Sequence, residues 1–404
     1  MKKDILFLCQ FFYPEYVSSA TLPFDTALAL TRAGYSVEAL CGYPQEFYQG
    51  AAVPEEETVQ GIRIRRLRYR IMDRGSKLGR IASYLSFTGT VLRRLGSFSG
   101  YRAVIVYSNP PLLPFAAYLS KKLFGCKLIF VAYDLYPEIA ERTHVIRSGS
   151  MMARVMQFIN RRVYRNADRV VTLSQEMRDF ICANRPVSGD RVAVIPNWYR
   201  DEGVSRPISP ESPFYRMAQE QFVVGYFGNL GTAQDLDTLL GAIRLLKDDA
   251  SVHFLFAGNG NKMPVLKETV QREKLKNVTV HAFLHGQDFQ DALSASGCAV
   301  VSLAPGLTGL CSPSKTYSYM MKGLPLLVIM GESDVARAAQ SGAGVCIANG
   351  DSAGLAAAIC RLRDDPALVA RMRQTCRRLY EQDYTPETAA QRYAALMQEL
   401  LKKD

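Results

Sequence analysis

Histidine is scarce in this sequence of 404 residues, and its nine cysteines do not form a metal-binding pattern. None of the cysteines belongs to a Cys-x-x-Cys pair, and the four histidines do not lie near cysteines at the spacing of a zinc site. Several cysteines fall in apolar runs, which favours buried, reduced thiols in a cytosolic protein. We therefore expect no metal ion and no other cofactor.

Long hydrophobic runs and the common catalytic signatures are also missing. No apolar run reaches the roughly 18 residues that a membrane-spanning helix needs, and the first residues lead into an expected strand without a signal peptide. The sequence has no G-x-x-x-x-G-K-[ST], H-E-x-x-H or G-x-S-x-G motif, so P-loop, zincin and hydrolase functions lack support. We expect a soluble or peripheral protein.

Acidic residues are too few to balance the basic ones, and the formal net charge is +11. Residues 61–94 hold ten arginines or lysines against one acid, Asp73, and a second basic stretch covers 147–165. Apolar residues recur at helical spacing over 78–95, which predicts an amphipathic helix that either packs on its sheet or rests on an anionic membrane. Nucleic acid is the competing polyanion, but no recognition-helix, RRM or zinc pattern supports it.

The chain is long enough for two domains, and expected strands alternate with helices twice along it. Near-continuous apolar strands separated by helices indicate parallel sheets covered on both faces. We predict an α/β protein of two Rossmann-like domains facing a central cleft, joined by a linker rich in Pro and Ser at 200–220. The expected strands are 5–9, 37–41, 62–67, 103–107, 128–132, 170–173 and 192–195, then 222–227, 252–257, 278–283, 299–303, 324–330 and 344–348.

Three loops of the second half follow expected strands, and in such sheets ligands bind at the carboxyl ends of strands. They are Phe227-Gly-Asn-Leu-Gly231, Ala257-Gly-Asn-Gly-Asn-Lys262 and Ser312-Pro-Ser-Lys315. Glycines let a ligand approach the backbone. We expect Lys315 in the first turn of a helix over 313–322 that Ser312 caps, where free N–H groups favour an anion. Each loop alone could be an empty turn, but together they predict a nucleotide-diphosphate pocket.

Two loops of the first half are the matching candidates for a second substrate. Val131–Glu138 follows a buried strand, so we expect Tyr133 and Asp134 to point into the cleft and Glu138 to add a polar contact for a sugar. A capping aspartate before a turn is the plainer explanation of Asp134, and on sequence alone it is favoured. The loop Phe12–Ala20 follows the first strand and is expected across the cleft from the phosphate loops.

The ordered set of these motifs resembles the retaining glycosyltransferases of family 4, which have the GT-B fold. The resemblance covers nearly the whole chain. It rests on Phe12-Tyr-Pro-Glu15, Asp134-Leu-Tyr-Pro-Glu138, Val194-Ile-Pro-Asn-Trp198, Gly228-Asn-Leu-Gly231, Ala257-Gly-Asn-Gly260 and Pro313-Ser-Lys-Thr-Tyr-Ser-Tyr-Met320. The Asp-Leu-Tyr-Pro-Glu and Pro-Ser-Lys forms resemble the branch that includes O-antigen and capsule N-acetyl-L-fucosamine transferases.

The sequence also departs from the pattern of that family. Many members carry two glutamates separated by seven residues, and the matching positions here are Leu310 and Ser318. The usual Arg and Lys after the first strand of the donor domain match Asn229 and Gln234. The charge of a bound diphosphate must then be met by Lys315, by Lys262 and by helix N-termini.

The resemblance implies transfer of an N-acetylated hexosamine or deoxyhexosamine from a UDP-linked donor, with retention of configuration. The implied acceptor is a sugar on a polyprenyl diphosphate lipid, in the synthesis of a surface polysaccharide such as capsule or O-antigen. The protein would be cytoplasmic and peripheral at the inner face of the cell membrane, held to anionic lipid by the basic patch of the first domain.

The implied domains are an acceptor-binding domain over 1–199, completed by a helix at 385–404, and a donor-binding domain over 200–384. Lys315 would stabilise the leaving diphosphate, and Asp134 is the candidate catalytic carboxylate. The expected donor-binding residues are Gly228, Asn229, Leu230, Gly231, Gly258, Asn259, Gly260, Lys262, Phe283, Ser314, Lys315 and Thr316. The expected acceptor-binding residues are Tyr13, Ser18, Ser19, Tyr133, Asp134 and Glu138.

Two other classes of function stay open on the sequence. One is a nucleotide-sugar-binding protein without transfer activity. The other is a nucleotide-sugar 2-epimerase, which shares the two-domain architecture. Epimerisation needs acid–base groups around the donor sugar, and the sequence offers no convincing set.

Overall fold

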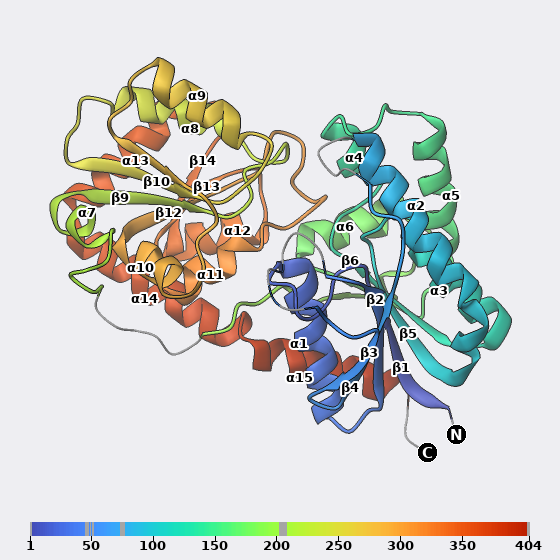
Figure 1. Ribbon diagram of the computed structural model, residues 1–404. Helices are drawn as coiled ribbons and strands as arrows, with labels where there is room; N and C mark the ends of the chain where they lie inside the picture. The colour runs from blue at the N-terminus through green and yellow to red at the C-terminus, as the bar shows by residue number, and fades with distance from the viewer. Residues whose placement is uncertain are drawn as a thin grey trace. The chain divides into compact units, whose positions relative to one another are not determined.

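A computed structural model of the protein describes residues 2–44, 48, 50, 52–72, 77–201 and 208–401. The chain divides into two compact units, each built on its own sheet (Figure 1). Unit 1 comprises Met1–Asn197, Gly309–Ser312 and Pro386–Asp404, and unit 2 comprises Trp198–Thr308 and Pro313–Thr385. The chain therefore leaves unit 1 and returns to it before it ends.

Unit 1 contains an eight-stranded sheet in the order β3-β4-β2-β1-β5-β6-β7-β8. All strand pairs are parallel except the hairpin of β3 and β4, which is antiparallel. The sequence did not indicate β3, because its residues alternate between exposed and half-buried and form no apolar run. The strands are β1 (Lys3–Leu8), β2 (Val37–Gly42), β3 (Glu56–Val59), β4 (Ile62–Leu67), β5 (Tyr101–Tyr107), β6 (Lys127–Ala132), β7 (Arg169–Thr172) and β8 (Val192–Val194).

Helices cover both faces of the unit 1 sheet, which explains why its inner strands are buried along nearly their whole length. Helices α2, α3 and α5 lie side by side on one face, and α1 packs against the C-terminal helix α15 on the other (Figure 1). The helices are α1 (Ser18–Arg32), α2 (Lys77–Arg93), α3 (Pro114–Phe124), α4 (Glu138–Arg142), α5 (Met151–Asn166), α6 (Gln175–Asn184) and α15 (Pro386–Leu400), with 3-10 turns η1 (Leu95–Gly100) and η2 (Gly189–Arg191).

Unit 2 contains a six-stranded parallel sheet in the order β11-β10-β9-β12-β13-β14. Its strands are β9 (Phe222–Phe227), β10 (Val252–Ala257), β11 (Val278–His281), β12 (Ser296–Ser302), β13 (Leu326–Ile329) and β14 (Gly344–Ile347). Its helices are α7 (Tyr215–Glu220), α8 (Leu236–Leu245), α9 (Met263–Arg272), α10 (Gly286–Ala295), α11 (Lys315–Met321), α12 (Asp334–Ala338), α13 (Ser352–Asp364) and α14 (Pro366–Asp383), with a π-helical turn η3 (Ala339–Ala343). The central position of β9 places its carboxyl end between those of β10 and β12.

The helix expected at 313–322 is shorter than predicted. It begins at Lys315, and its N-cap is Ser314 rather than Ser312. The carbonyl of Pro313 accepts from the Thr316 N–H (3.2 Å) and from the Thr316 hydroxyl (2.8 Å), so the chain makes a tight turn before the helix starts. Ser312 lies outside this turn, which corrects its assignment as the cap.

Arg65 and Arg66, two residues of the basic stretch predicted at 61–94, are paired with acids inside unit 1, whereas Arg63, Arg68 and Arg70 stay exposed. Arg65 donates to Glu38 (3.2 Å) and to Glu56 (3.1 Å). Arg66 is fully buried and pairs with Glu57. Two of the three acids belong to β3, the strand that the sequence did not indicate. Arg74 lies outside the described residues, as do the side chains of Lys77 and Arg80.

Among the described residues, no helix is both long and apolar enough to cross a membrane. All nine cysteines are free, and Cys182 is the one that is exposed.

Candidate functional site

The loops after β9 and β10 form one continuous backbone surface at the carboxyl edge of the unit 2 sheet. The Gly228 N–H donates to the carbonyl of Ala257 (2.8 Å), and the Leu230 N–H donates to the carbonyl of Asn259 (2.7 Å). The Lys262 N–H closes the arrangement by donating to the Leu230 carbonyl (3.0 Å). Two of the three predicted phosphate loops are therefore in direct contact.

Glycine is required at two points of this surface. A Cβ on Gly258 would lie 2.0 Å from the Gly228 carbonyl, and one on Gly260 would lie 2.3 Å from the Leu230 carbonyl. Both residues have positive φ angles, +153° and +133°. Gly228 also has a positive φ, +108°, but its Cβ position faces open space as far as the described residues reach. Bare backbone beside open space is what allows a ligand to approach closely.

Lys315 is held over the end of β9. Its Nζ donates to the carbonyl of Asn229 (3.3 Å) and lies 3.6 Å from the centre of the Tyr226 ring. The Tyr226 hydroxyl donates to the same carbonyl (3.1 Å). Although the side chain is only half-buried, burial of the ammonium group lowers the pKa of Lys315 well below its usual range. An anion bound beside Nζ would favour the charged form again.

Tyr319 joins the helix of Lys315 to the last residue of β9. Its buried hydroxyl accepts from the Phe227 N–H (2.8 Å) and donates to the Phe227 carbonyl (3.2 Å). The sequence did not indicate Tyr226 or Tyr319 as site residues. The signal for Tyr319 is its position four residues after Lys315, which places both side chains on one face of α11.

Some predicted donor residues use their side chains internally. Leu230 belongs to the hydrophobic core of unit 2, and the Thr316 hydroxyl is bonded to Pro313. The side chains of these two residues therefore pack inside unit 2, and their roles in donor binding stay predictions. The ammonium of Lys262 donates to the Gln234 carbonyl (2.6 Å), so this lysine lies at the carboxyl edge of the unit 2 sheet.

The other predicted donor residues differ in their access to the surface. Gly231 is buried and donates its N–H to the Gln234 side chain (2.7 Å), whereas Asn229 and Asn259 are exposed. Ser314 precedes α11 and is half-buried. Phe283 follows β11 and is exposed, with its ring 4.9 Å from that of His285.

The two positions where family members carry glutamate are occupied by internal contacts. The Ser318 hydroxyl donates to the Lys315 carbonyl (2.9 Å). Leu310 is buried within unit 1, and its carbonyl accepts from the Leu135 N–H (2.8 Å). The positive charge of Lys315 is therefore not neutralised by either position.

In unit 1 the predicted acceptor residues Tyr133 and Asp134 directly follow β6. Both backbone N–H groups donate to the Ser108 hydroxyl, which follows β5, at 3.1 Å each. Asp134 also forms an isolated β-bridge with Cys311, in the short piece of chain that groups with unit 1. Burial raises the pKa of Asp134 to about 6. A carboxyl with that pKa exchanges its proton near neutral pH, as a general acid or base does.

The remaining predicted acceptor residues differ in their position and contacts. The Tyr13 ring is 37% exposed and stacks on Phe24 with 5.0 Å between centroids. Ser18 and Ser19 begin α1 after the β1 loop. The Glu138 carboxylate pairs with Arg185 at the start of α4, and its role in acceptor binding stays a prediction.

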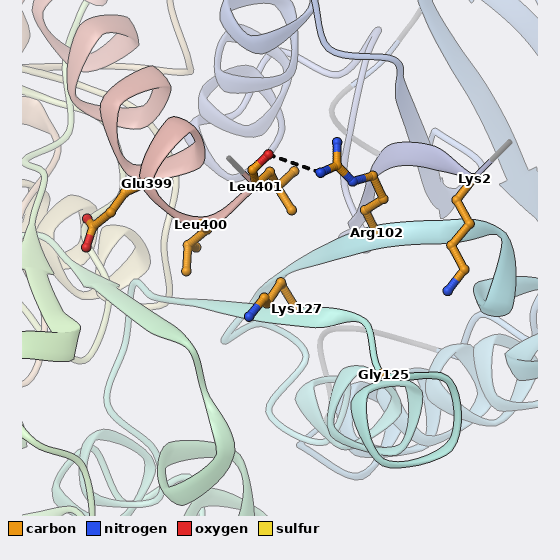
Figure 2. A pocket seen from close by; sticks show the side chains of 7 residues that line it. All are labelled: Lys2, Arg102, Gly125, Lys127, Glu399, Leu400 and Leu401. Carbon is orange, nitrogen blue, oxygen red and sulfur yellow. Dashed lines mark hydrogen bonds between the residues drawn. The ribbon is translucent and has the colours of Figure 1, made fainter. Parts of the chain in front are cut away.

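A cavity of about 380 Å³ in unit 1 lies away from these loops (Figure 2). Its lining residues lie just before β1, at the starts of β5 and β6, directly after α3 and at the end of α15, so it opens at the amino edge of the sheet. Arg102 projects beside it and donates to the Leu401 carbonyl (3.0 Å), the bond drawn in Figure 2. This cavity is therefore distinct from the predicted acceptor loops.

Comparisons with known proteins agree with the two-unit architecture. Residues 24–198 match the model of the glycosyl transferase 4-like domain, and residues 221–365 match the model of glycosyl transferases group 1. The probable glycosyltransferase WbjE of Pseudomonas aeruginosa is 27% identical over 230 residues, which cover 56% of this chain. The match spans 57% of the length of that relative.

Solved structures share the fold across the whole chain. Sucrose-phosphate synthase from Thermosynechococcus elongatus has a TM-score of 0.75 at 15% identity, with all of both chains covered. HepE from Anabaena in complex with UDP-glucose has a TM-score of 0.71 at 18% identity, covering 98% of this chain and 100% of that one. With a glycosyltransferase domain model matched in each unit and two parallel-sheet α/β cores, the chain belongs to the glycosyltransferases with the GT-B fold.

Proposed function

We propose that the protein transfers a sugar from a UDP-linked donor bound by unit 2 to a sugar acceptor bound by unit 1. The observation that carries the proposal is the position of Lys315, whose ammonium lies beside the glycine loops after β9 and β10. A diphosphate suits this arrangement, because the lysine supplies a positive charge and the glycines leave the neighbouring backbone open to close approach. The fold shared with HepE, whose structure is a complex with UDP-glucose, supports a donor of this class.

In the proposed reaction the bond between the anomeric carbon and the diphosphate oxygen breaks, and the acceptor hydroxyl oxygen bonds to that carbon. The diphosphate leaves with the bonding electrons, so negative charge grows on it in the transition state. Lys315 stabilises that charge, which lowers the barrier more than it strengthens ground-state binding. The acceptor proton passes to the leaving phosphate or to Asp134. We propose that the configuration of the sugar is retained.

The acceptor that we propose is a sugar carried by polyprenyl diphosphate, in surface polysaccharide synthesis. The transferred group would be an N-acetylated hexosamine or deoxyhexosamine. These assignments rest on the resemblance of the Asp134–Glu138 and Pro313–Lys315 motifs to the capsule and O-antigen branch. Such an acceptor lies in a membrane, so we also propose that the protein works at an anionic membrane surface.

A panel of nucleotide sugars tests the donor assignment. A ligand that binds only the native state raises the melting temperature, so UDP-sugars should raise it and GDP-sugars should not. Transfer is then measured with the best donor and synthetic lipid-diphosphate sugars, and the anomeric configuration of the product is read by NMR. No shift with any UDP-sugar would overturn the proposal. Conversion of UDP-GlcNAc without an acceptor would identify an epimerase, and binding without any product would identify a non-catalytic binder.

A further inference from the structure

The three helices on one face of the unit 1 sheet contain no acidic residue. Helices α2, α3 and α5 are 17, 11 and 16 residues long and include no Asp or Glu. Their basic residues are Lys77, Arg80, Arg93, Lys121, Lys122, Arg154, Arg161, Arg162 and Arg165. The other helices of unit 1 each carry acids, for example α1, α6 and α15. The acid-free layer α2–α3–α5 therefore concentrates most of the excess positive charge of the chain.

The outward face of α5 combines this charge with exposed apolar side chains. Met151, Val155 and Phe158 are 74%, 38% and 50% exposed. Their spacing of four and three residues puts them on one helical stripe. Arg154 and Arg161 are exposed beside the stripe. The opposite face of α5 is buried against unit 1, so the stripe is not part of the core of that unit.

The arginines of α5 lie beside its exposed apolar side chains, so that they could contact charged groups while the apolar side chains contact an apolar layer. The guanidinium of Arg162 lies 3.5 Å from the centre of the Phe158 ring, and the long side chains of Arg154, Arg161 and Arg165 extend from exposed positions. Basic side chains that flank apolar ones on a helix are typical of helices that lie in the interface of a membrane. Leu123 of α3 adds a further apolar side chain, 61% exposed, to the same layer.

We propose that the outward face of α5 docks on an anionic lipid surface. Met151, Val155 and Phe158 enter the boundary between headgroups and acyl chains, while Arg154, Arg161 and Arg165 contact lipid phosphates. The inference deepens the proposed membrane association, because it names the surface that makes the contact. It rests on the proposed function only for the reason that the protein would need a membrane. It also moves the contact away from the run at 63–66, whose arginines are paired with Glu38, Glu56 and Glu57.

The expected effects follow from the two parts of the surface. Each arginine near an anionic surface contributes about fivefold in binding, so Arg154→Gln with Arg161→Gln should weaken it roughly 25-fold. Replacing Val155 and Phe158 with serine should weaken it roughly tenfold or more, because both lose apolar area that enters the interface. All four side chains are exposed, so the fold should persist.

The test is sedimentation of the full chain with vesicles of phosphatidylcholine alone or mixed equally with phosphatidylglycerol. The matched controls lie in unit 2: Leu245→Ser with Val265→Ser for apolar exposure, and Lys267→Gln with Arg371→Gln for charge. The wild type and both controls should bind the mixed vesicles, with binding that falls as salt rises. Both α5 variants should bind weakly while their far-ultraviolet circular dichroism and melting temperature match the wild type.

Three results would overturn the inference. They are equal binding by the α5 variants and the wild type, equal binding to vesicles without phosphatidylglycerol, or α5-dependent binding to an oligonucleotide with none to vesicles. The thermal shift with UDP-sugars is measured on the same variants. A normal shift without vesicle binding would reject the docking surface alone, whereas vesicle binding without any shift would reject the proposed donor.

Discussion

Replacing Lys315 with methionine should leave unit 2 folded and reduce turnover far more than donor affinity. Methionine keeps an unbranched apolar side chain over the Tyr226 ring and removes only the ammonium. The Asn229 carbonyl keeps the hydroxyl of Tyr226 as a donor, so the loop retains a hydrogen bond. The variant therefore tests the charge rather than the packing of the site.

The magnitude follows from the position of the ammonium. Two unit charges 4 Å apart interact by about 4 kcal/mol at the effective dielectric of a protein surface. Part of that is offset, because burial disfavours the protonated form of the lysine, as its lowered pKa indicates. Removal of one preorganised donor to a developing charge typically costs about 100-fold to 1,000-fold in turnover. We expect a loss of about a hundredfold or more in kcat for Lys315→Met.

The assay measures kcat and KM with a saturating acceptor, and UDP affinity by calorimetry. Lys262→Met is the matched control, since its ammonium is bonded to the Gln234 carbonyl at the same edge of the sheet. The loss of kcat in Lys262→Met should be smaller than in Lys315→Met. Near-normal turnover in a folded Lys315→Met protein would refute the role of Lys315. An equal loss in kcat and in UDP affinity would mean that the lysine acts in the ground state.

The pH dependence of UDP binding gives an independent measurement on Lys315. Because burial lowers its pKa, the ammonium loses its proton at a lower pH than an exposed lysine does. Binding of an anion favours the protonated form, so affinity should fall as pH rises through the lowered pKa. The methionine variant should lack this fall.

Other substitutions test the parts of the site separately. Gly258→Ala places a Cβ 2.0 Å from a backbone carbonyl and should abolish the UDP-induced thermal shift, whereas Gly350→Ala, at a positive φ in open space, should keep it. Tyr319→Phe removes the hydroxyl that bonds both polar groups of Phe227 and should lower the free energy of unfolding by about 1–3 kcal/mol in urea titrations; an unchanged value would contradict that role. For Asp134, a pKa raised to about 6 from 3.8 means that the folded state holds the proton longer than the unfolded state, so this residue costs stability as pH rises through that window. The melting temperature of Asp134→Asn relative to the wild type should therefore increase from pH 4 to pH 7, and a constant difference would contradict it.

The parallel cores of both units could be predicted from sequence because buried parallel strands are continuous apolar runs. Strands such as β5 and β10 fall where the pattern places them. Strand β3 was not predicted, since it is an exposed edge strand whose residues face solvent on alternate positions. The sequence therefore also showed no sign of the acids that pair with Arg63, Arg65 and Arg66, because these acids lie largely on β3.

The site could be predicted only as far as strand ends and glycines indicate it. Position in the pattern places Gly228, Gly258 and Lys315 at one edge of one sheet. It does not say which side chains turn inward. The Leu230 side chain enters the core, and the Tyr319 hydroxyl reaches back to β9. Both depend on packing between distant segments, which a local pattern does not contain.

The C-terminal helix α15 has a consequence for the order in which the protein is made. Its buried residues Tyr393 and Met397 belong to unit 1, although nearly two hundred residues of unit 2 precede them in the chain. Domains fold as units while synthesis proceeds from the N-terminus. The whole of unit 2 leaves the ribosome before α15 does, so the domain that is begun first is completed last. Until then the surface of α1 that α15 covers stays open to water and to chaperones.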